Sequence, residues 1–400
     1  MKIFEKEPNL QFMNKRNYAF FLSGLIIAIG VFIFFNHGFN LGIDFTGGTN
    51  IEVSFRKDVS EDELRISLRE VGLAKSMIQR IGESENKFFI KTVKTLEMKA
   101  SGEGTNEGTE NESGEGEVGG GVSKLIEKAL MSNEERERSA NKMDLNNVSQ
   151  PEIAGLLVSK GVPRDTAEET AAKLITFKSR SDNSTLGLIG SFGEIEQLDL
   201  KKQALSVLKE NTYLGSFTFL STETVGPQVG HDLRQKATLA TVWAMIGMLI
   251  YIGFRFKFVF GFAAVITLLH DVLVSLTFIV IFQVEVSLHV VAAILTIVGY
   301  SLNDTIVIFD RVRDNIKLMR GHGAGEILDR SINQTLSRTI VTSGTTLVVV
   351  FSLFFFGGEV IHSFSFTLLV GVIIGTYSSI FQSCAWLKIW ERKAIGRKKK

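Results

Sequence analysis

Residues 290–315 have the sequence VVAAILTIVGYSLNDTIVIFDRVRDN, in which a long apolar run contains one acidic residue, Asp304. An apolar run of this length can cross the hydrocarbon core of a bilayer as a helix. An ionised carboxylate inside such a span costs about 2.5–3.5 kcal/mol on insertion scales. Asp304 therefore needs an explanation, such as proton transfer, ion binding or a buried partner.

Further apolar stretches near or above bilayer-spanning length occur along the rest of the chain. Together with the first, they lie at about 18–35, 238–254, 258–282, 288–309, 340–357 and 363–387. We therefore predict a polytopic α-helical membrane protein with six transmembrane helices, helix 1 at 18–35 and helices 2–6 within 238–390. Helix 1 is interpreted as a retained anchor, because its exit, FFNHGFNLGIDF, lacks an A-x-A-like site for cleavage of a signal peptide.

Composition excludes several classes of function. The chain has 400 residues with 44 basic and 43 acidic side chains, a balance that excludes a broadly basic nucleic-acid binder. A single cysteine, Cys384, excludes an intrachain disulfide and a CxxC site. The phosphate loop, HExxH and GxSxG motifs are missing from the sequence. We therefore expect no enzymatic activity, no metal site and no bound cofactor, with an ion gradient as the energy source of any pump.

The distribution of Lys and Arg predicts the orientation, because short cytoplasmic segments hold the excess of positive charge. Basic residues number four up to residue 16, two at 255–257, six at 310–338 and seven from residue 388 onward. The connections at 283–287 and 357–362 have none. The N-terminal tail (1–17) and the basic tail (391–400) are therefore predicted to lie in the cytoplasm, with residues 37–236 forming one large domain on the far side.

The predicted far-side domain has α+β periodicity. Alternation in TNIEVSFR places Ile51, Val53 and Phe55 on one side of a strand, and Ser60 with Glu63 forms a capping box at the start of a helix. Two more strands follow, in SMIQRIG and NKFFIKTV, and then a helix at about 194–210 and a strand in YLGSFTFLSTETVG. The resulting β-α-β-β-α-β order is that of a ferredoxin-like domain.

A long insertion at about 96–193 separates the third predicted strand from the last predicted helix. Residues 100–121 consist almost wholly of Gly, Glu, Ser, Thr and Asn, so we predict that they are disordered. Weak helical periodicity returns from about 122 to 180. This periodicity favours a small helical subdomain, and a poorly folded spacer is the alternative.

Polar residues within the predicted spans are candidates for a proton relay. Asp304 is the first of them, with Arg338 and Thr342 at the start of the fifth span as its prospective partners. If these residues face one another, protonation of Asp304 would break an Asp–Arg pair and shift the helices. The structural alternatives are a hydrogen-bonded Asp304 and an Arg338 that only marks the cytoplasmic side.

Asn303 beside Asp304, and His270 with Asp271 in the third span, are weaker candidates for the same relay. Adjacent helical residues point about 100° apart, so His270 and Asp271 need not contact each other. Asp310 and Arg311 are interpreted as a solvated helix end. The oxygen-rich surroundings of Asp304 also suit Na⁺, so the choice between H⁺ and Na⁺ as the coupling ion stays open.

The chain resembles the SecF family of protein-export membrane proteins in a series of motifs that occur in the same order. The motifs are GIDFTGGT (42–49), TVGPQVG (224–230), YIGFRFKF (251–258), LLHDV (268–272), VGYSLNDTIVIFDRVRDN (298–315) and TLSRTIVTSGTT (335–346). The resemblance covers about residues 15–95 and 195–390, and the insertion departs from it. The fourth-span motif also resembles the resistance-nodulation-division transporters, so the alternative is a proton-coupled exporter of small molecules or lipids. A third interpretation is a membrane assembly scaffold with no transport activity of its own.

The resemblance implies a six-helix protein of the bacterial inner membrane with one periplasmic ferredoxin-like domain. It implies pairing with SecD, association with the SecYEG channel and YajC, contact with membrane lipid, and use of the proton-motive force to draw out a translocating preprotein. In the family, proton conduction is associated with residues that match Asp304, Arg338 and Thr342. The GIDFTGGT motif implies a domain-coupling role for Asp44, Phe45, Thr46, Gly47 and Gly48. A Gly-enabled turn into a strand is the alternative for this motif.

Overall fold

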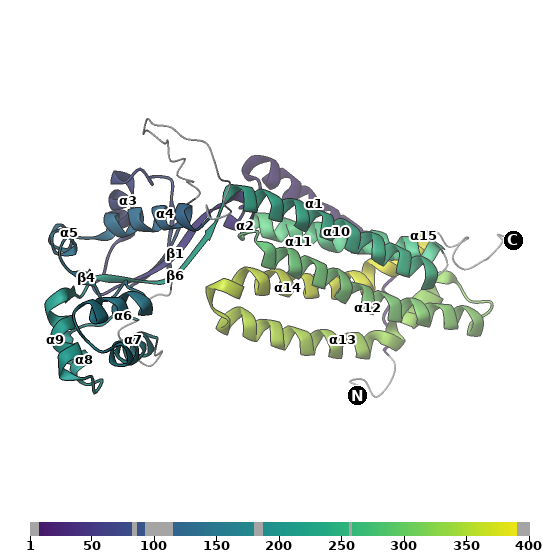
Figure 1. The fold of residues 1–400 in the computed structure, drawn as a ribbon. Helices are drawn as coiled ribbons and strands as arrows, with labels where there is room; N and C mark the ends of the chain where they lie inside the picture. The colour runs from purple at the N-terminus through teal and green to yellow at the C-terminus, as the bar shows by residue number, and fades with distance from the viewer. Residues whose placement is uncertain (1–7, 82–85, 93–114, 180–186, 256–257, 390–400) are drawn as a thin grey trace, which may run out of the picture. The chain divides into compact units, whose positions relative to one another are not determined.

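A computed structural model describes residues 8–81, 86–92, 115–179, 187–255 and 258–389 (Figure 1). The chain divides into two compact units, which are described separately. One comprises Met1–Phe45 and Asp232–Lys400, and the other comprises Thr46–His231. The first unit contains most of each long apolar helix, and the second unit contains a sheet and short helices.

Six helices in the described part of the chain are long and apolar enough to cross a membrane, as predicted. They are α1 (Arg16–His37), α10 (Pro227–Arg255), α11 (Phe258–Ile281), α12 (Leu288–Leu318), α13 (Ala324–Phe356) and α14 (Gly358–Ser378), which continues through a π-helical turn, η1 (Ser379–Ser383), into α15 (Cys384–Ile389). In Figure 1, helices α11, α12, α13 and α14 pack side by side.

Helix α13 begins well before the span predicted at 340–357. Its first four turns are polar on one side, but Ile327, Leu328, Ile332 and Leu336 are buried in the main cluster of the bundle. Apolar residues at this spacing extend the helix beyond the apolar run that hydropathy detects. Tertiary packing, which a hydropathy window does not measure, therefore sets the helix start.

Close contacts between helices of the bundle occur at glycines. A Cβ at Gly371 of α14 would lie 2.1 Å from Ile297 of α12, and a Cβ at Gly30 of α1 would lie 2.1 Å from Thr277 of α11. Small residues let transmembrane helices approach closely, and van der Waals packing then stabilises their association. The bundle is therefore assembled around contacts that larger side chains would block.

The second unit contains a four-stranded antiparallel sheet with the strand order β2-β3-β1-β6. The elements of this layer are β1 (Gly48–Phe55), α3 (Glu61–Glu70), β2 (Met77–Ile81), β3 (Lys87–Thr92) and β6 (Phe217–Val225). Ile51, Val53 and Phe55 are buried, as the alternation predicts. The predicted capping box is present, since Ser60 Oγ accepts from Glu63 N and Glu63 accepts from Ser60 N, each at 3.2 Å.

The second helix on this sheet is not the one that the sequence predicts. Helix α4 (Glu115–Leu130) contacts α3, β1 and β6, and its Val122, Ile126 and Ala129 are buried in the core of the sheet. Residues 93–114, which hold most of the stretch expected to be disordered, lie outside the described residues. The rest of that stretch, from Glu115, is helical, because the apolar face at the C-terminal end of α4 anchors the helix.

The predicted helix at 194–210 consists of two helices, α8 (Phe192–Glu196) and α9 (Lys202–Asn211). Asp199 between them has a φ of 47°, a left-handed conformation that ends a right-handed helix. Helix α9 packs in a separate cluster with α8, α6 (Gln150–Ser159) and α7 (Arg164–Lys178). Two short strands, β4 (Met143–Asp144) and β5 (Thr212–Tyr213), pair in parallel beside this cluster.

Helix α5 (Asn133–Ser139) is tied to the start of β6 by Glu135. The Glu135 carboxylate is 7% exposed, accepts from Ser132 N and from Ser216 N at 2.6 Å, and closes a capping box. Burial raises the pKa of Glu135, but the hydrogen bonds from Ser132 and Ser216 outweigh it and leave the pKa below its usual value. The folded protein therefore favours the ionised form of Glu135.

Replacing Glu135 with glutamine is expected to destabilise this region by about 1.5–3 kcal/mol near pH 7, because charge-assisted hydrogen bonds are lost. The folded pKa is depressed, so the stabilisation is present above the ordinary pKa of 4.5 and is lost as the pH falls through the folded value. Hydrogen exchange of α5 in the full chain measures the difference. Glu134→Gln is the control, since Glu134 is exposed and, within the described residues, its one ion pair is with Arg138. Equal protection of both variants at neutral pH would contradict the prediction.

Candidate functional site

Asp304 lies in the interior of the bundle on α12 and is 2% exposed. Within the described structure, its Oδ2 atom is buried and has no hydrogen-bond partner. The neighbouring Thr305 Oγ1 is also buried, with no hydrogen-bond partner among the described residues. A buried carboxylate oxygen with no donor is costly when the group is ionised. The site therefore favours a bound proton or an approaching cation.

Arg338 of α13 is the charged group that acts electrostatically on the Asp304 carboxylate. No ion pair joins the two side chains among the residues that the structure describes, and Arg338 is exposed. Thr342, one turn along α13, is half-buried, and its carbonyl oxygen accepts from Thr345 and Thr346, each at 2.9 Å. Asp304 and Arg338 are thus close enough to interact electrostatically, but in the described structure they do not form a salt bridge.

Hydroxyl groups connect the three helices around this region. Ser343 of α13 accepts from Tyr300 of α12 at 3.1 Å and from Thr376 of α14 at 2.7 Å. These hydrogen bonds fix α12, α13 and α14 relative to one another at the level just before Asp304. Sequence reasoning missed Tyr300 and Thr376, although both are polar residues within apolar runs.

The polar residues in the C-terminal part of α12 have the structural roles expected of a helix end. Asp310 forms an ion pair with Arg255 of α10 at 2.8 Å. Arg311 donates to Gln334 of α13 at 2.6 Å. Asn303, by contrast, is exposed on the surface of α12 within the span. Asp310 and Arg311 are therefore satisfied locally, whereas Asn303 and Arg338 are polar side chains on the outside of spanning helices.

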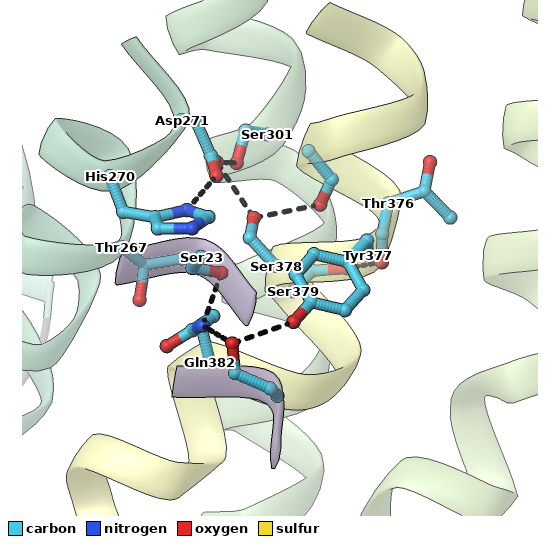
Figure 2. A network of polar contacts seen from close by, with 12 residues as sticks. Ser23, Thr267, His270, Asp271, Ser301, Thr376, Tyr377, Ser378, Ser379 and Gln382 are labelled. Carbon is cyan, nitrogen blue, oxygen red and sulfur yellow. Dashed lines mark hydrogen bonds and ion pairs between the residues drawn. The ribbon is translucent and has the colours of Figure 1, made fainter. Parts of the chain in front are cut away.

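A second buried carboxylate, Asp271 of α11, is the centre of a hydrogen-bond network (Figure 2). Asp271 is fully buried, and its Oδ2 accepts from Ser301 of α12 at 2.5 Å and from Ser378 of α14 at 2.8 Å. Its Oδ1 lies 2.9 Å from Nδ1 of His270. His270 and Asp271 therefore do contact each other, although adjacent helical residues point about 100° apart. The sequence did not single out Ser301 or Ser378.

Nearby, a second group of hydrogen bonds joins α14 and η1 to the first helix. Gln382 of η1 donates to Ser23 Oγ of α1 at 3.0 Å, and the Tyr377 hydroxyl donates to the carbonyl of Ala19 at 3.1 Å (Figure 2). π-Helical turns often occur at functional sites. The available sequence signal was the polar run around TYSSIFQS in an otherwise apolar span. No cluster of three or more His, Cys, Asp or Glu suited to a metal ion occurs in the described part of the chain.

The exit from α1 is joined to the start of α12 by the short helix α2 (Ile43–Thr46). The Oδ2 of Asp44 accepts from the backbone N–H of Leu288, the first residue of α12, at 2.8 Å. Ser287 at the N-cap position makes no side-chain capping bond, so Asp44 caps this end of α12 instead. The capping acid therefore contacts the helix that carries Asp304.

The glycines that follow Asp44 form the entrance to the sheet. Gly47 and Gly48 have φ values of 70° and 143°, in the region that favours glycine. A Cβ at Gly47 would lie 2.9 Å from Cα of Pro227, the first residue of α10. Phe45 is buried, and Thr46 Oγ1 donates to the carbonyl of Gly47 at 3.1 Å. The glycine pair thus permits the close approach of the two chain segments that enter and leave the sheet.

Comparisons with known proteins identify this arrangement. Residues 205–393 match the model of the C-terminal region of the protein export membrane proteins SecD and SecF, and residues 32–59 match the SecD/SecF GG motif. The chain is 36% identical over 392 residues to protein translocase subunit SecF of Koribacter versatilis, covering 95% of this chain and 91% of that relative. The chain belongs to the SecF family. With its six candidate spans, this SecF family member is a multi-pass membrane protein.

Other SecF relatives match over similar lengths. The chain is 31% identical over 374 residues to SecF of Escherichia coli O157:H7, covering 94% of this chain and 85% of that protein. Among solved structures, it is similar to SecDF of Thermus thermophilus, a translocon-associated membrane protein, with a TM-score of 0.62 and 28% identity. That alignment covers 98% of this chain and 40% of the SecDF chain. The SecF chain therefore spans about two fifths of the solved SecDF protein.

Proposed function

We propose that this chain is the SecF subunit of a SecDF complex that uses the proton-motive force to assist protein translocation through SecYEG and release on the periplasmic side. Asp304 would bind the proton, and Arg338 with Thr342 would respond to its charge. The observation that carries the proposal is the buried Asp304 carboxylate, whose Oδ2 has no partner in the described structure although Arg338 acts on it electrostatically.

Two arrangements of α12 and α13 follow from this geometry. An ionised Asp304 gains by contact with Arg338, whereas a protonated Asp304 has no such requirement. A proton that crosses a potential of 100 mV supplies about 2.3 kcal/mol, enough to change the ratio of two conformations by more than tenfold. Asp304 would thereby convert proton passage into a change of helix position. The work is mechanical, so we propose no bond-breaking chemistry.

The exposed polar side chains of the spanning helices favour SecD as a partner. Asn303 and Arg338 are exposed on spanning helices, where contact with lipid would be costly. A second helical bundle with polar groups would cover them, and SecD would supply it. SecYEG, YajC and the preprotein are proposed as further partners because of membership in the SecF family.

We also propose the location of each part of the chain. The excess of Lys and Arg in the segments around 310–338 and after 388 supports cytoplasmic termini in a bacterial inner membrane. The unit Thr46–His231 would then lie in the periplasm. Its antiparallel β2-β3-β1-β6 sheet with α3 on one face supports a ferredoxin-like α+β domain, into which the insertion adds α4 to α8.

Asp304→Asn tests the proposed function. In cells with this variant as the only copy, we expect maturation and release of a signal-bearing protein to slow by about tenfold or more, because the coupling to the gradient is lost. Pulse-chase labelling measures the rate, and the amount of variant in the membrane is checked. Export at the normal rate would remove Asp304 from the mechanism and favour a scaffold or a solute exporter.

Asp310→Asn is the matched control, because it is the same substitution on the same helix in a partly exposed ion pair with Arg255. Such pairs contribute little, so export should stay within about twofold of normal. Repeating both measurements with a protonophore, and with Na⁺ replaced by K⁺, distinguishes H⁺ from Na⁺ as the coupling ion. Loss of export in Na⁺-free medium alone would contradict proton coupling.

A further inference from the structure

We propose that His270 and Asp271 form a second proton-binding centre, which Ser301 links to the helix that carries Asp304. The centre lies wholly within the helical bundle, on α11 between α12, α14 and η1 (Figure 2). Its role in export rests on the proposed function, whereas proton binding at His270 does not.

The first observation is the set of donors around Asp271. Ser301 Oγ lies 2.5 Å and Ser378 Oγ 2.8 Å from Oδ2, so both hydroxyls can donate to this oxygen when the carboxylate is ionised. The Ser378 hydroxyl also lies 3.1 Å from the carbonyl of Gly375, the other acceptor for its single proton. With Asp271 ionised and His270 neutral, one proton lies at the 2.9 Å contact between Oδ1 and His270 Nδ1. With that proton alone, the His270–Asp271 pair has a net charge of −1 inside a transmembrane bundle. Such a charge is costly without a compensating cation.

The second observation is the open nitrogen of His270. Its Nε2 atom is buried and lacks a hydrogen-bond partner among the described residues, and the side chain is 10% exposed. A second proton can add to the lone pair at Nε2, since Nδ1 is already engaged with Asp271. The resulting imidazolium and carboxylate form a pair with no net charge. The geometry therefore provides both the place for a proton and the electrostatic reason to bind it.

Among the described residues, the groups that face the pair from the neighbouring helices supply no other charge. Helix α14 contributes Tyr377, whose ring lies 6.5 Å from the His270 ring and whose hydroxyl is turned to Ala19 of α1. Helix α12 contributes Ser301, and η1 contributes the neutral Gln382. Within the described residues, His270 is the group whose protonation would place a positive charge beside Asp271. Protonation of His270 thus neutralises the pair without a proton on the carboxylate itself.

The third observation is the link between the two carboxylates. Ser301 precedes Asp304 by three residues, so the two side chains lie on adjacent turns of one side of α12, and both are buried. If α12 moves when Asp304 gains or loses a proton, the Ser301–Asp271 hydrogen bond must lengthen or reform. The charge on the His270–Asp271 pair sets the strength of that hydrogen bond. The second centre would therefore bias the position of α12.

The test uses the full chain in lipid bilayers, labelled with ¹⁵N-histidine and studied by solid-state NMR between pH 5 and 9. His270→Asn identifies the His270 signal, because asparagine keeps a donor near Nδ1 but cannot bind a proton. In the unchanged chain, we expect this signal to change from neutral imidazole to imidazolium as the pH falls. In Asp271→Asn, we expect the imidazolium signal to be lost. His289→Asn, on the exposed first turn of α12, should leave the His270 signal unchanged.

A His270 signal that stays neutral over the whole range would overturn the proposal and leave a purely structural hydrogen bond. An unchanged titration in Asp271→Asn would do the same. Pulse-chase export at several external pH values then tests the role in transport, where His270→Asn should flatten the pH dependence. If Asp304→Asn exports normally and the His270 signal changes with pH, the proposed function is wrong and this inference stands. If Asp304→Asn exports poorly and the His270 signal stays neutral, this inference is wrong and the proposed function stands.

Discussion

Replacing Gly47 with alanine is expected to destabilise the chain strongly and to reduce its amount in the membrane. A φ of 70° costs an L-residue about 1–2 kcal/mol. In addition, the new Cβ would lie 2.9 Å from Cα and 3.1 Å from N of Pro227, and backbone atoms cannot move aside as the end of a side chain can. Overpacking of this kind adds about 1–3 kcal/mol. The thermal unfolding midpoint of the purified full chain measures the sum.

Gly38→Ala separates the two contributions. Gly38 has the same φ of 70°, but a Cβ there would meet nothing within 4 Å. With its ψ of −167°, Gly38 lies in a region that only glycine adopts readily, so Gly38→Ala should show a backbone cost alone, about 1–3 kcal/mol. If the two variants unfold at the same temperature, the contact between Gly47 and Pro227 does not restrict the entrance to the sheet. In that case the glycine-enabled turn is sufficient to explain the motif.

Much of the membrane unit could be predicted from the sequence, because a bilayer imposes a length and an apolar composition on each span. The six predicted stretches correspond to helices α1 and α10 to α14. The start of α13 could not be predicted in this way, since its buried apolar residues are interrupted by polar ones such as Ser331 and Gln334, which bond to α12. Hydropathy detects contact with lipid, whereas the ends of these helices depend on contact with protein.

The strands of the second unit were also predictable, because alternation at Ile51, Val53 and Phe55 reports a half-buried sheet directly. Which helix packs on the sheet beside α3 could not be predicted from the sequence. Both α4 and α9 have one apolar face, with Ile126 and Leu208 as fully buried members. Their periodicity does not state which surface each will cover. That choice depends on contacts between residues far apart in the chain.

The candidate residues could be identified from the sequence more readily than their hydrogen-bond partners. Asp304 and Asp271 stand out because charged residues are rare in spans. Their difference appears only in three dimensions: Asp271 has hydrogen-bond partners at both oxygens, and Asp304 Oδ2 has no partner in the described structure. The serines around Asp271 could not be ranked from sequence, because serine hydroxyls in spans commonly bond to their own helix.

Gly371→Ala is expected to separate α14 from α12 and to disturb both buried carboxylates. The new Cβ would lie 2.1 Å from Cδ1 and 2.2 Å from Cγ1 of Ile297, a side chain that is 1% exposed and has no free space to enter. We expect a loss of about 1–3 kcal/mol in stability. Because Ser301 follows Ile297 by one turn, its hydrogen bond to Asp271 should also weaken. Export by the variant should slow as a result.

A compensating substitution makes this prediction specific. Ile297→Ala removes the atoms of Ile297 nearest the new Cβ, so the double variant Gly371→Ala with Ile297→Ala should recover part of the stability and export that Gly371→Ala loses. Gly247→Ala in α10 is the control, since a Cβ there meets nothing within 4 Å and should leave both unchanged. Equal defects in the single and double variants would mean that Gly371 acts elsewhere than at the contact with Ile297. Recovery would show that the distance between α12 and α14 controls the geometry of the Asp271 network.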